Sequence, residues 1–343
     1  GKELKEVIDA EKCNHFIIPL TRKITPLKDL NAVYKLFILL RQLKPDIVHT
    51  HTPKAGIIGM LASYFAKVPN RLHTVAGLPL LETTGVKRKI LNFVEKITYS
   101  CATKVYPNSN GLKQIILQNR FVKEDKLKVI ANGSSNGIDT SYFDPKLFSI
   151  KDKEDLKTKL EINKTDFVFI FIGRIVSDKG INELVEAFDK LCLYEENIKL
   201  LLVGSFEDDL DPLQKKTKLL INNNDKIISV GYQSDVRPYF PISDCLVLPS
   251  YREGFPNVVM QSGAMGSPSI VSNINGCNEI IENNINGLVI KVKSINAIYD
   301  AMKKIISDKT LFNKLRLNSR KIIKMKYERE VYWNLLLREY KNL

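Results

Sequence analysis

Short apolar runs recur through the second half of the chain, each followed by a polar or glycine-containing turn and a segment of helical periodicity. Such runs, bounded by turns, are typical of strands buried on both faces of a parallel sheet. The predicted strands of this half are residues 167–172, 199–203, 227–230, 245–248 and 269–271. Helices with an apolar stripe are predicted from about Gly180, from Val258 and over residues 296–325.

The first half shows the same alternation of strands and helices. Amphipathic helices are predicted over residues 27–43 and 87–101, and further helices over 3–10, after Pro53 and up to Asn119. The predicted strands are residues 16–19, 47–48, 71–77, 104–109 and 128–130. Alternation from end to end predicts an α/β fold with two doubly wound, Rossmann-like domains facing each other across a cleft.

The predicted domains are residues 1–150 and 151–327, joined through a charge-rich hinge at 145–165. The segment 328–343 is predicted to be a helix that crosses back to the first domain. A length of 343 residues suits two domains of ordinary size. No apolar run approaches the length of a transmembrane helix. Five scattered cysteines without metal spacing fit reduced thiols in a cytosolic protein.

Basic residues are concentrated in the first half of the chain. Residues 1–150 carry 23 Lys and Arg against 12 Asp and Glu, whereas the remainder carries 29 against 26. A basic domain attracts phosphate groups, nucleic acid or an anionic membrane surface. Lys87-Arg-Lys89 opens one of the predicted amphipathic helices, which favours a membrane-facing surface, although a solvated face fits equally well.

Two strand-to-helix turns carry the candidate chemistry. In Pro249-Ser-Tyr-Arg-Glu-Gly-Phe-Pro256, a carboxylate and backbone N–H groups are predicted at the carboxyl edge of the sheet, where open α/β sheets bind ligands. The turn after residue 172 holds Arg174 and Lys179, a fork and a mobile point charge that suit a diphosphate. The acidic stretch from Glu207 to Asp211 is interpreted as a surface loop and not as a magnesium site.

These motifs resemble the retaining glycosyltransferases of family 4, which have the GT-B fold. Glu253-Gly-Phe-Pro256 is similar to the donor-sugar signature of that family, and Gly173-Arg-Ile-Val-Ser-Asp-Lys-Gly180 and Gly276-Cys-Asn-Glu279 occur in the family's order. The segments 46–51 and 73–79 resemble the subgroup that builds capsules and O-antigens, and almost the whole chain is covered. The chain departs from the pattern at Gln261, where the family has a second Glu, and at Ala76, where many members have His.

The resemblance implies transfer of a sugar from a nucleotide-sugar donor, expected to be a UDP-sugar, to a polyprenyl-diphosphate-linked saccharide. Arg174, Lys179 and Glu253 are the expected catalytic residues. The expected donor-binding residues are Gly173, Gly254, Phe255, Pro256, Asn257, Val258, Gln261 and Glu279. His49, His51 and His73 are assigned to an acceptor pocket in the first domain, with a structural role as the alternative. A metal at His49 and His51 would need a third ligand, and only His15 and His73 remain in the chain. No metal, cofactor or nucleic acid is expected.

The implied location is the cytoplasmic face of the cell membrane, where a peripheral enzyme would meet an embedded acceptor. Family members begin with a strand and a glycine-rich loop, so we expect that about 30 further residues precede residue 1. Two other functions stay open: a non-catalytic GT-B partner subunit, and a sugar-nucleotide epimerase of the same fold. Release of nucleoside diphosphate that depends on the donor would distinguish an enzyme from a scaffold.

Overall fold

The computed structural model of the protein describes residues 8, 11, 13–21, 25–209 and 211–343, and it forms two compact units. The smaller unit comprises Gly1–Val75, Thr84–Tyr106 and Phe121–Leu127, and the larger unit comprises Ala76–Thr83, Pro107–Arg120 and Lys128–Leu343. The predicted domain boundary near residue 150 stays a prediction, as does a return of the last helix to the first domain. The predicted helix at 3–10 lies outside the described residues, apart from Ile8.

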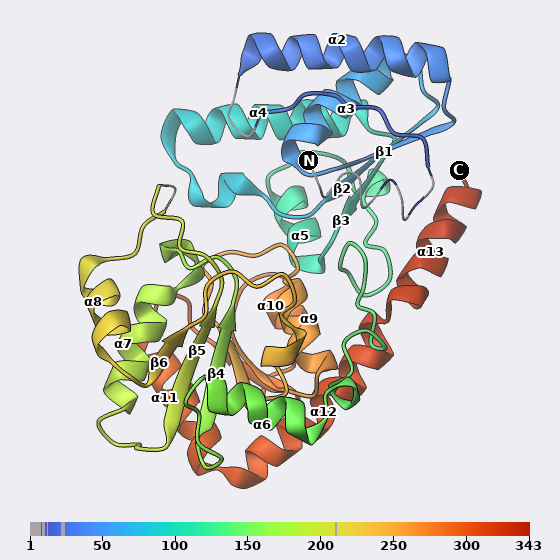
Figure 1. The fold of residues 1–343 in the computed structure, drawn as a ribbon. Coiled ribbons are helices and arrows are strands. Elements are labelled where there is room, and N and C mark those ends of the chain that lie inside the picture. The colour runs from blue at the N-terminus through green and yellow to red at the C-terminus, as the bar shows by residue number, and fades with distance from the viewer. Residues whose placement is uncertain (1–7, 9–10, 12, 22–24, 210) are drawn as a thin grey trace. The chain divides into compact units, whose positions relative to one another are not determined.

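The smaller unit is built on a parallel sheet of three strands in the order β1-β2-β3 (Figure 1). Helix α3 packs against both α2 and α4, so the three helices form a neighbouring row. The elements are α2 (Pro26–Leu43), β1 (Ile47–His51), α3 (Pro53–Phe65), β2 (Asn70–Val75), α4 (Gly85–Cys101) and β3 (Lys104–Pro107). These elements confirm the helices predicted from apolar stripes in this half of the chain.

Two predicted strands of the first half are wrong. Residues 16–19 form no strand, because Phe16 and Ile17 are 54% and 71% exposed and so lack the burial that stabilises an apolar strand. Residues 128–130 also form no strand. Pairing with β3 is limited to one isolated bridge between Val105 and Leu127, and residues 128–130 do not continue it.

The larger unit contains a six-stranded parallel sheet in the order β6-β5-β4-β7-β8-β9. Its strands are β4 (Phe167–Ile172), β5 (Ile198–Val203), β6 (Ile227–Ser229), β7 (Cys245–Leu248), β8 (Ser269–Ser272) and β9 (Gly287–Ile290). Strand β7 is buried throughout and β4 is buried from Val168 onward, as their uninterrupted apolar sequences predict. Strand β9 is an addition to the predicted set, since its apolar run is only Leu288-Val-Ile290 and its first residue is Gly287.

Helices cover both faces of this sheet (Figure 1). Helix α7 packs against α8 and α11, and α9 packs against α10 and α12. The helices of this unit are α5 (Asn110–Gln118), α6 (Ile150–Lys159), α7 (Ile181–Leu191), α8 (Lys215–Asn223), α9 (Asn257–Ala264), α10 (Cys277–Ile280), α11 (Ile295–Ser307), α12 (Lys309–Tyr327) and α13 (Arg329–Lys341). Helix α6 occupies the charge-rich stretch predicted as a hinge, and a capping box of Ser149 and Asp152 begins it.

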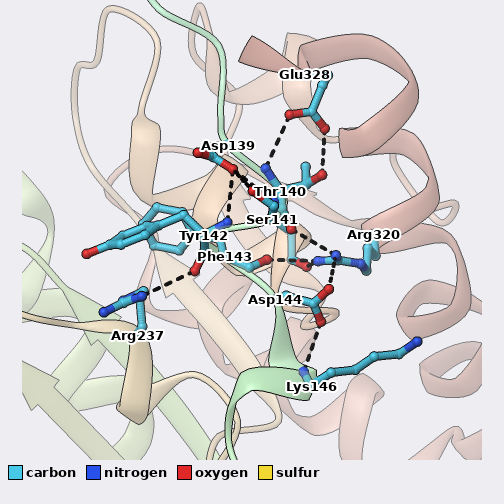
Figure 2. Close-up of polar contacts among 11 residues, drawn as sticks. Asp139, Thr140, Ser141, Tyr142, Phe143, Asp144, Lys146, Arg237, Arg320 and Glu328 are labelled. Atoms are coloured by element: carbon cyan, nitrogen blue, oxygen red, sulfur yellow. Dashed lines mark hydrogen bonds and ion pairs between the residues drawn. The ribbon is translucent and has the colours of Figure 1, made fainter. Parts of the chain in front are cut away.

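Arg320 of α12 and Glu328 at the C-terminal end of that helix both bond to the loop that precedes α6 (Figure 2). Arg320 donates hydrogen bonds to the carbonyl oxygens of Thr140 (2.9 Å) and Phe143 (2.8 Å), and to the Asp144 carboxylate (2.8 Å). It also donates to the carbonyl oxygen of Ala264 at the last turn of α9. This cluster, which we call the Arg320 hub, joins the loop 140–144, helix α12 and helix α9.

No helix among the described residues combines the length and apolar character needed to cross a lipid bilayer.

Candidate active site

The strand order of the larger unit defines where a ligand would bind. From β4 the chain proceeds to β5 and β6 on one side, whereas β7, β8 and β9 lie on the other side of β4. The direction of connection therefore reverses between β4 and β7. In open α/β sheets, ligands bind outside the carboxyl ends of the strands at such a switch point. The turns that follow β4 and β7 are the two turns that the sequence predicted to carry the chemistry.

The turn after β4 presents two cations. Gly173 ends the strand, Arg174 follows it, and Lys179 ends a single 3-10 turn (Ser177–Lys179) before α7. Gly180 has a φ of 72°, and a Cβ atom built there would lie 2.3 Å from the carbonyl oxygen of Pro249. Only glycine fits this contact, which brings the turn after β4 against the turn after β7.

The carboxylate of Glu253 meets Lys179 directly. Lys179 Nζ lies 2.5 Å from Glu253 Oε1, and Ser250 donates its hydroxyl to the same oxygen at 2.8 Å. Both charged side chains are less than one-fifth exposed. The two turns are further joined by an ion pair between Arg252 and Asp178, with 3.0 Å between Nη2 and Oδ2.

These groups line a cavity of about 240 Å³ in the larger unit. Its lining residues are Ala76, Gly77, Leu78, Leu81, Arg174, Asp178, Lys179, Arg252, Glu253 and Gly254. Three of these side chains are basic and two are acidic. Arg174 is 47% exposed and forms an ion pair with Glu207, with 3.0 Å between Nη1 and Oε2. The cations therefore stand beside carboxylates that a stronger anion, such as a diphosphate, can replace.

Helix α9 begins directly after the Glu253 turn. Pro256 precedes the first residue of α9, and no side chain caps this end of the helix. Backbone N–H groups of the first turn point out of the helix end, which is the arrangement that binds anions. Phe255 is buried, and its ring packs against Tyr327 at 5.5 Å between centroids. Gln261 lies on the second turn, half-buried, and its side chain makes no hydrogen bond with the part of the chain that the structure describes.

Glu279 lies outside the cavity lining and accepts hydrogen bonds from a different helix. Its two oxygens accept from the backbone N–H groups of Asn110 (2.8 Å) and Gly111 (2.9 Å), which begin α5. A carboxylate at this position is favoured by the partial positive charge of a helix N-terminus. The sequence indicated the start of α10 at Gly276, but it held no signal for a partner 168 residues away.

The three histidines of the predicted acceptor pocket belong to the smaller unit. His49 and His51 stack at 4.4 Å between ring centroids at the carboxyl end of β1. His49 shares a hydrogen bond with Thr74, and His73 shares one with Thr50. Burial, together with the neighbouring histidines, lowers the pKa of His49 to about 3. Burial lowers the pKa of His73 to about 4. Both imidazoles are therefore neutral at pH 7.

Acidic side chains between Glu207 and Asp211 take part in holding the turn after β4. Glu207 pairs with Arg174, and the Asp211 carboxylate accepts from the backbone N–H of Asp178 at 2.7 Å. Among the described residues, no group of three or more His, Cys, Asp or Glu side chains is arranged to hold a metal ion.

Sequence reasoning missed several residues that build the site. Ser250, Arg252 and Asp178 lie next to predicted residues, yet their contacts become visible only when the two turns are brought together. Asn275 donates its Nδ2–H group to the carbonyl oxygen of Glu253 at 2.7 Å. The only sequence signal for Asn275 was its position directly before the motif Gly276-Cys-Asn-Glu279.

Two family patterns match most of the chain. The family described as "Glycosyl transferases group 1" matches residues 152–322, which contain the cavity residues Arg174, Lys179 and Glu253. The family described as "Glycosyl transferase 4-like domain" matches residues 9–133.

Individual proteins are similar over nearly the full length. The capsular polysaccharide biosynthesis glycosyltransferase CapM of Staphylococcus aureus is 33% identical over 98% of this chain and 86% of its own. The UDP-Gal:alpha-D-GlcNAc-diphosphoundecaprenol alpha-1,3-galactosyltransferase of Escherichia coli is 32% identical over 90% of this chain and 78% of its own. The crystal structure of a glycosyltransferase from Rickettsia africae has a TM-score of 0.82 at 26% identity, and covers 100% of this chain and 88% of that chain.

Proposed function

The chain belongs to the group 1 glycosyl transferases, retaining enzymes of the GT-B fold, and we propose that it transfers a sugar from a UDP-sugar to a polyprenyl-diphosphate-linked saccharide in surface polysaccharide synthesis. The observation that carries this proposal is the placement of Arg174, Lys179 and Glu253 around one cavity at the switch point of the larger sheet. The name of the similar E. coli protein, which specifies UDP-Gal as donor and GlcNAc-diphosphoundecaprenol as acceptor, supports these donor and acceptor classes. The name of CapM supports a place in surface polysaccharide synthesis.

In the proposed reaction, the bond between the sugar and the nucleoside diphosphate breaks while negative charge grows on the departing phosphate. Arg174 and Lys179 bind that diphosphate, and their attraction to it increases as the bond breaks. Such differential binding lowers the barrier. Glu253 accepts hydrogen bonds from hydroxyl groups of the donor sugar. Because Lys179 Nζ lies 2.5 Å from Glu253 Oε1, the phosphate-binding and sugar-binding groups are adjacent.

The remaining donor contacts are assigned to the Glu253 turn and the first two turns of α9. Gly254 lines the cavity, and the peptide units of Phe255, Pro256, Asn257 and Val258, which follow it in the chain, are assigned to the donor beyond the cavity lining. Gly173 allows the chain to turn beneath the phosphates. Gln261, whose side chain is uncommitted within the described structure, faces the ribose. Glu279 contributes indirectly by fixing the N-terminus of α5.

The acceptor is assigned to the smaller unit, at the carboxyl end of β1. Neutral His49 and His51 offer hydrogen bonds to saccharide hydroxyls, and they are not suited to pairing with a phosphate charge, since burial disfavours protonation of both rings. His73 of β2 is buried next to Gly56 and shares a hydrogen bond with Thr50 of β1. This bond supports the position of His49 and His51, which flank Thr50 on β1.

A donor screen tests the proposed function. Incubation with UDP-hexoses and UDP-N-acetylhexosamines in the presence of an undecaprenyl-diphosphate-linked saccharide should release UDP and extend the lipid-linked product with retention of the anomeric configuration. Release should be slow without acceptor. Conversion of the nucleotide sugar into an epimer without transfer would favour the epimerase alternative, and no consumption of any donor would contradict the proposal.

Membrane attachment follows from the proposed acceptor, which is embedded in the bilayer. Helix α4 exposes Val86, Ile90 and Phe93 at 74%, 49% and 65%, and these positions form one stripe flanked by exposed lysines. Exposed apolar side chains next to basic ones are typical of a helix that lies in the membrane interface. We propose that α4 holds the enzyme on the cytoplasmic face of the cell membrane.

Reversing the charges of Lys87, Arg88 and Lys89 to glutamate should abolish this attachment. Each well-placed basic residue contributes about 1 kcal/mol near an anionic surface. Loss of three lowers partitioning by roughly 100-fold or more. Sedimentation with phosphatidylglycerol-containing vesicles at low and high salt measures the effect. The charge-matched control reverses Lys314, Lys321 and Lys324, which are exposed on α12. Equal losses in both triple variants would indicate only a general charge effect.

A further inference from the structure

The loop that carries Glu253 is held from behind by one amide side chain. Asn275 Nδ2 lies 2.7 Å from the carbonyl oxygen of Glu253 and 3.3 Å from that of Gly254, so it donates to two successive peptide groups. Asn275 is half-buried and lies in the turn between β8 and α10. These contacts involve the backbone on which the Glu253 carboxylate is mounted.

Close backbone packing leaves this loop little freedom. A Cβ atom built on Gly254 would lie 1.7 Å from the carbonyl oxygen of Ala76, and one built on Gly276 would lie 2.2 Å from that of Gly254. Gly276 also has a φ of 76°, which favours glycine. The peptide of Gly254 is therefore enclosed by other backbone on two sides, and the Asn275 amide supplies its polar contact.

The turn that contains Asn275 is itself braced. Glu279 accepts from the N–H groups of Asn110 and Gly111 and, at 3.4 Å, from that of Gly276. A Cβ atom built on Gly111 would lie 2.6 Å from the Cβ atom of Asn275. The start of α5 thus presses against Asn275 from one side while the Glu253 loop receives its hydrogen bonds on the other.

We propose that Asn275 is a positioning residue for donor-sugar recognition, which sets the direction of the Glu253 carboxylate by fixing the peptide groups of Glu253 and Gly254. The inference rests on the proposed role of Glu253 toward the donor sugar. An asparagine suits this role because its NH2 group donates twice, whereas an aspartate of the same shape would direct oxygen atoms toward two carbonyl oxygens. Asn275 acts through Glu253 and does not touch the donor itself.

The consequence is a selective loss of sugar recognition when the amide is removed. Asn275→Ala leaves two carbonyl oxygens without this donor, and we expect kcat/KM for the UDP-sugar to fall by about 10- to 100-fold. The Kd for UDP alone should change by less than about threefold, since Arg174 and Lys179 are untouched. Asn275→Asp should show the same selectivity. Asn278→Ala is the matched control, because Asn278 is exposed on α10 and bonds to Asn273.

A double-mutant cycle with Glu253→Gln decides whether the effect passes through Glu253. If Asn275 positions that carboxylate, Asn275→Ala should lower kcat/KM by less than about threefold in the Glu253→Gln background. Effects that multiply in the double variant, or a parallel loss of UDP affinity and thermal stability in both Asn275 variants, would overturn the inference. If Glu253→Gln alone keeps full activity, the proposed role of Glu253 fails instead.

Discussion

Replacing Lys179 with alanine will lower the rate of sugar transfer by about 10²- to 10³-fold. The ammonium group of Lys179 lies at the switch point of the larger sheet, 2.5 Å from Glu253 and less than one-fifth exposed. A cation in such a partly desolvated position stabilises a departing diphosphate far more than a solvated one does. Arg174→Ala should reduce the rate in the same direction, since its guanidinium occupies the same cavity. Single-turnover rates with saturating donor measure both effects.

The control for these variants removes a lysine of α7, the helix that follows the turn, and this lysine lies outside the cavity. Lys190, near the end of α7, lies over the ring of Tyr299 and does not line the cavity. Lys190→Ala should keep full activity. Thermal unfolding of all three variants should stay close to that of the unchanged protein, because Lys179 and Arg174 contribute mainly to ligand binding. Rates of the Lys179 and Arg174 variants within threefold of the unchanged protein would remove both residues from the mechanism.

Replacing Arg320 with alanine will destabilise the larger unit by about 2–4 kcal/mol. The Arg320 hub supplies charge-assisted hydrogen bonds to three carbonyl oxygens and to the Asp144 carboxylate, and its side chain is 28% exposed (Figure 2). Without the Arg320 guanidinium, these acceptors have only water as a replacement donor. The substitution also removes a cation from the C-terminus of α9, where positive charge is favourable. The midpoint of thermal unfolding should fall by about 5–10 °C.

Arg316 provides the matched control for the hub. It lies one turn earlier on α12 and is exposed, so Arg316→Ala should change the midpoint by about 1 °C or less. Arg320→Lys should recover only part of the loss, because an ammonium group cannot reproduce the planar fork that reaches Thr140 and Asp144 together. An unaltered midpoint in Arg320→Ala would show that the hub contributes little to stability.

The parts of the fold that could be predicted from sequence are those fixed by local pattern. The apolar runs at Phe167–Ile172 and Cys245–Leu248 match β4 and β7 residue for residue, because strands buried on both faces leave no polar position. The same rule failed at residues 16–19, where apolar residues stay exposed, and it missed β9, whose first residue is a glycine. Burial depends on tertiary packing, and a short apolar segment does not reveal whether another part of the chain covers it.

The candidate site divides in the same way. The turns holding Arg174, Lys179 and Glu253 could be identified from motifs, but the 2.5 Å contact of Lys179 with Glu253 joins segments 74 residues apart. The roles of Asn275 and Glu279 likewise depend on distant backbone groups. Sequence spacing predicts which residues share an element. It does not predict which elements a turn will contact.

The most direct measurement is a crystal structure of the enzyme with UDP bound. If the diphosphate site is at the switch point, phosphate oxygens will lie about 2.7–3.2 Å from the Arg174 guanidinium and the Lys179 ammonium. Arg174 will then have left Glu207, its partner at 3.0 Å in the structure described above. A UDP molecule bound elsewhere, with Arg174 still paired to Glu207 and Lys179 still paired to Glu253, would contradict the central claim.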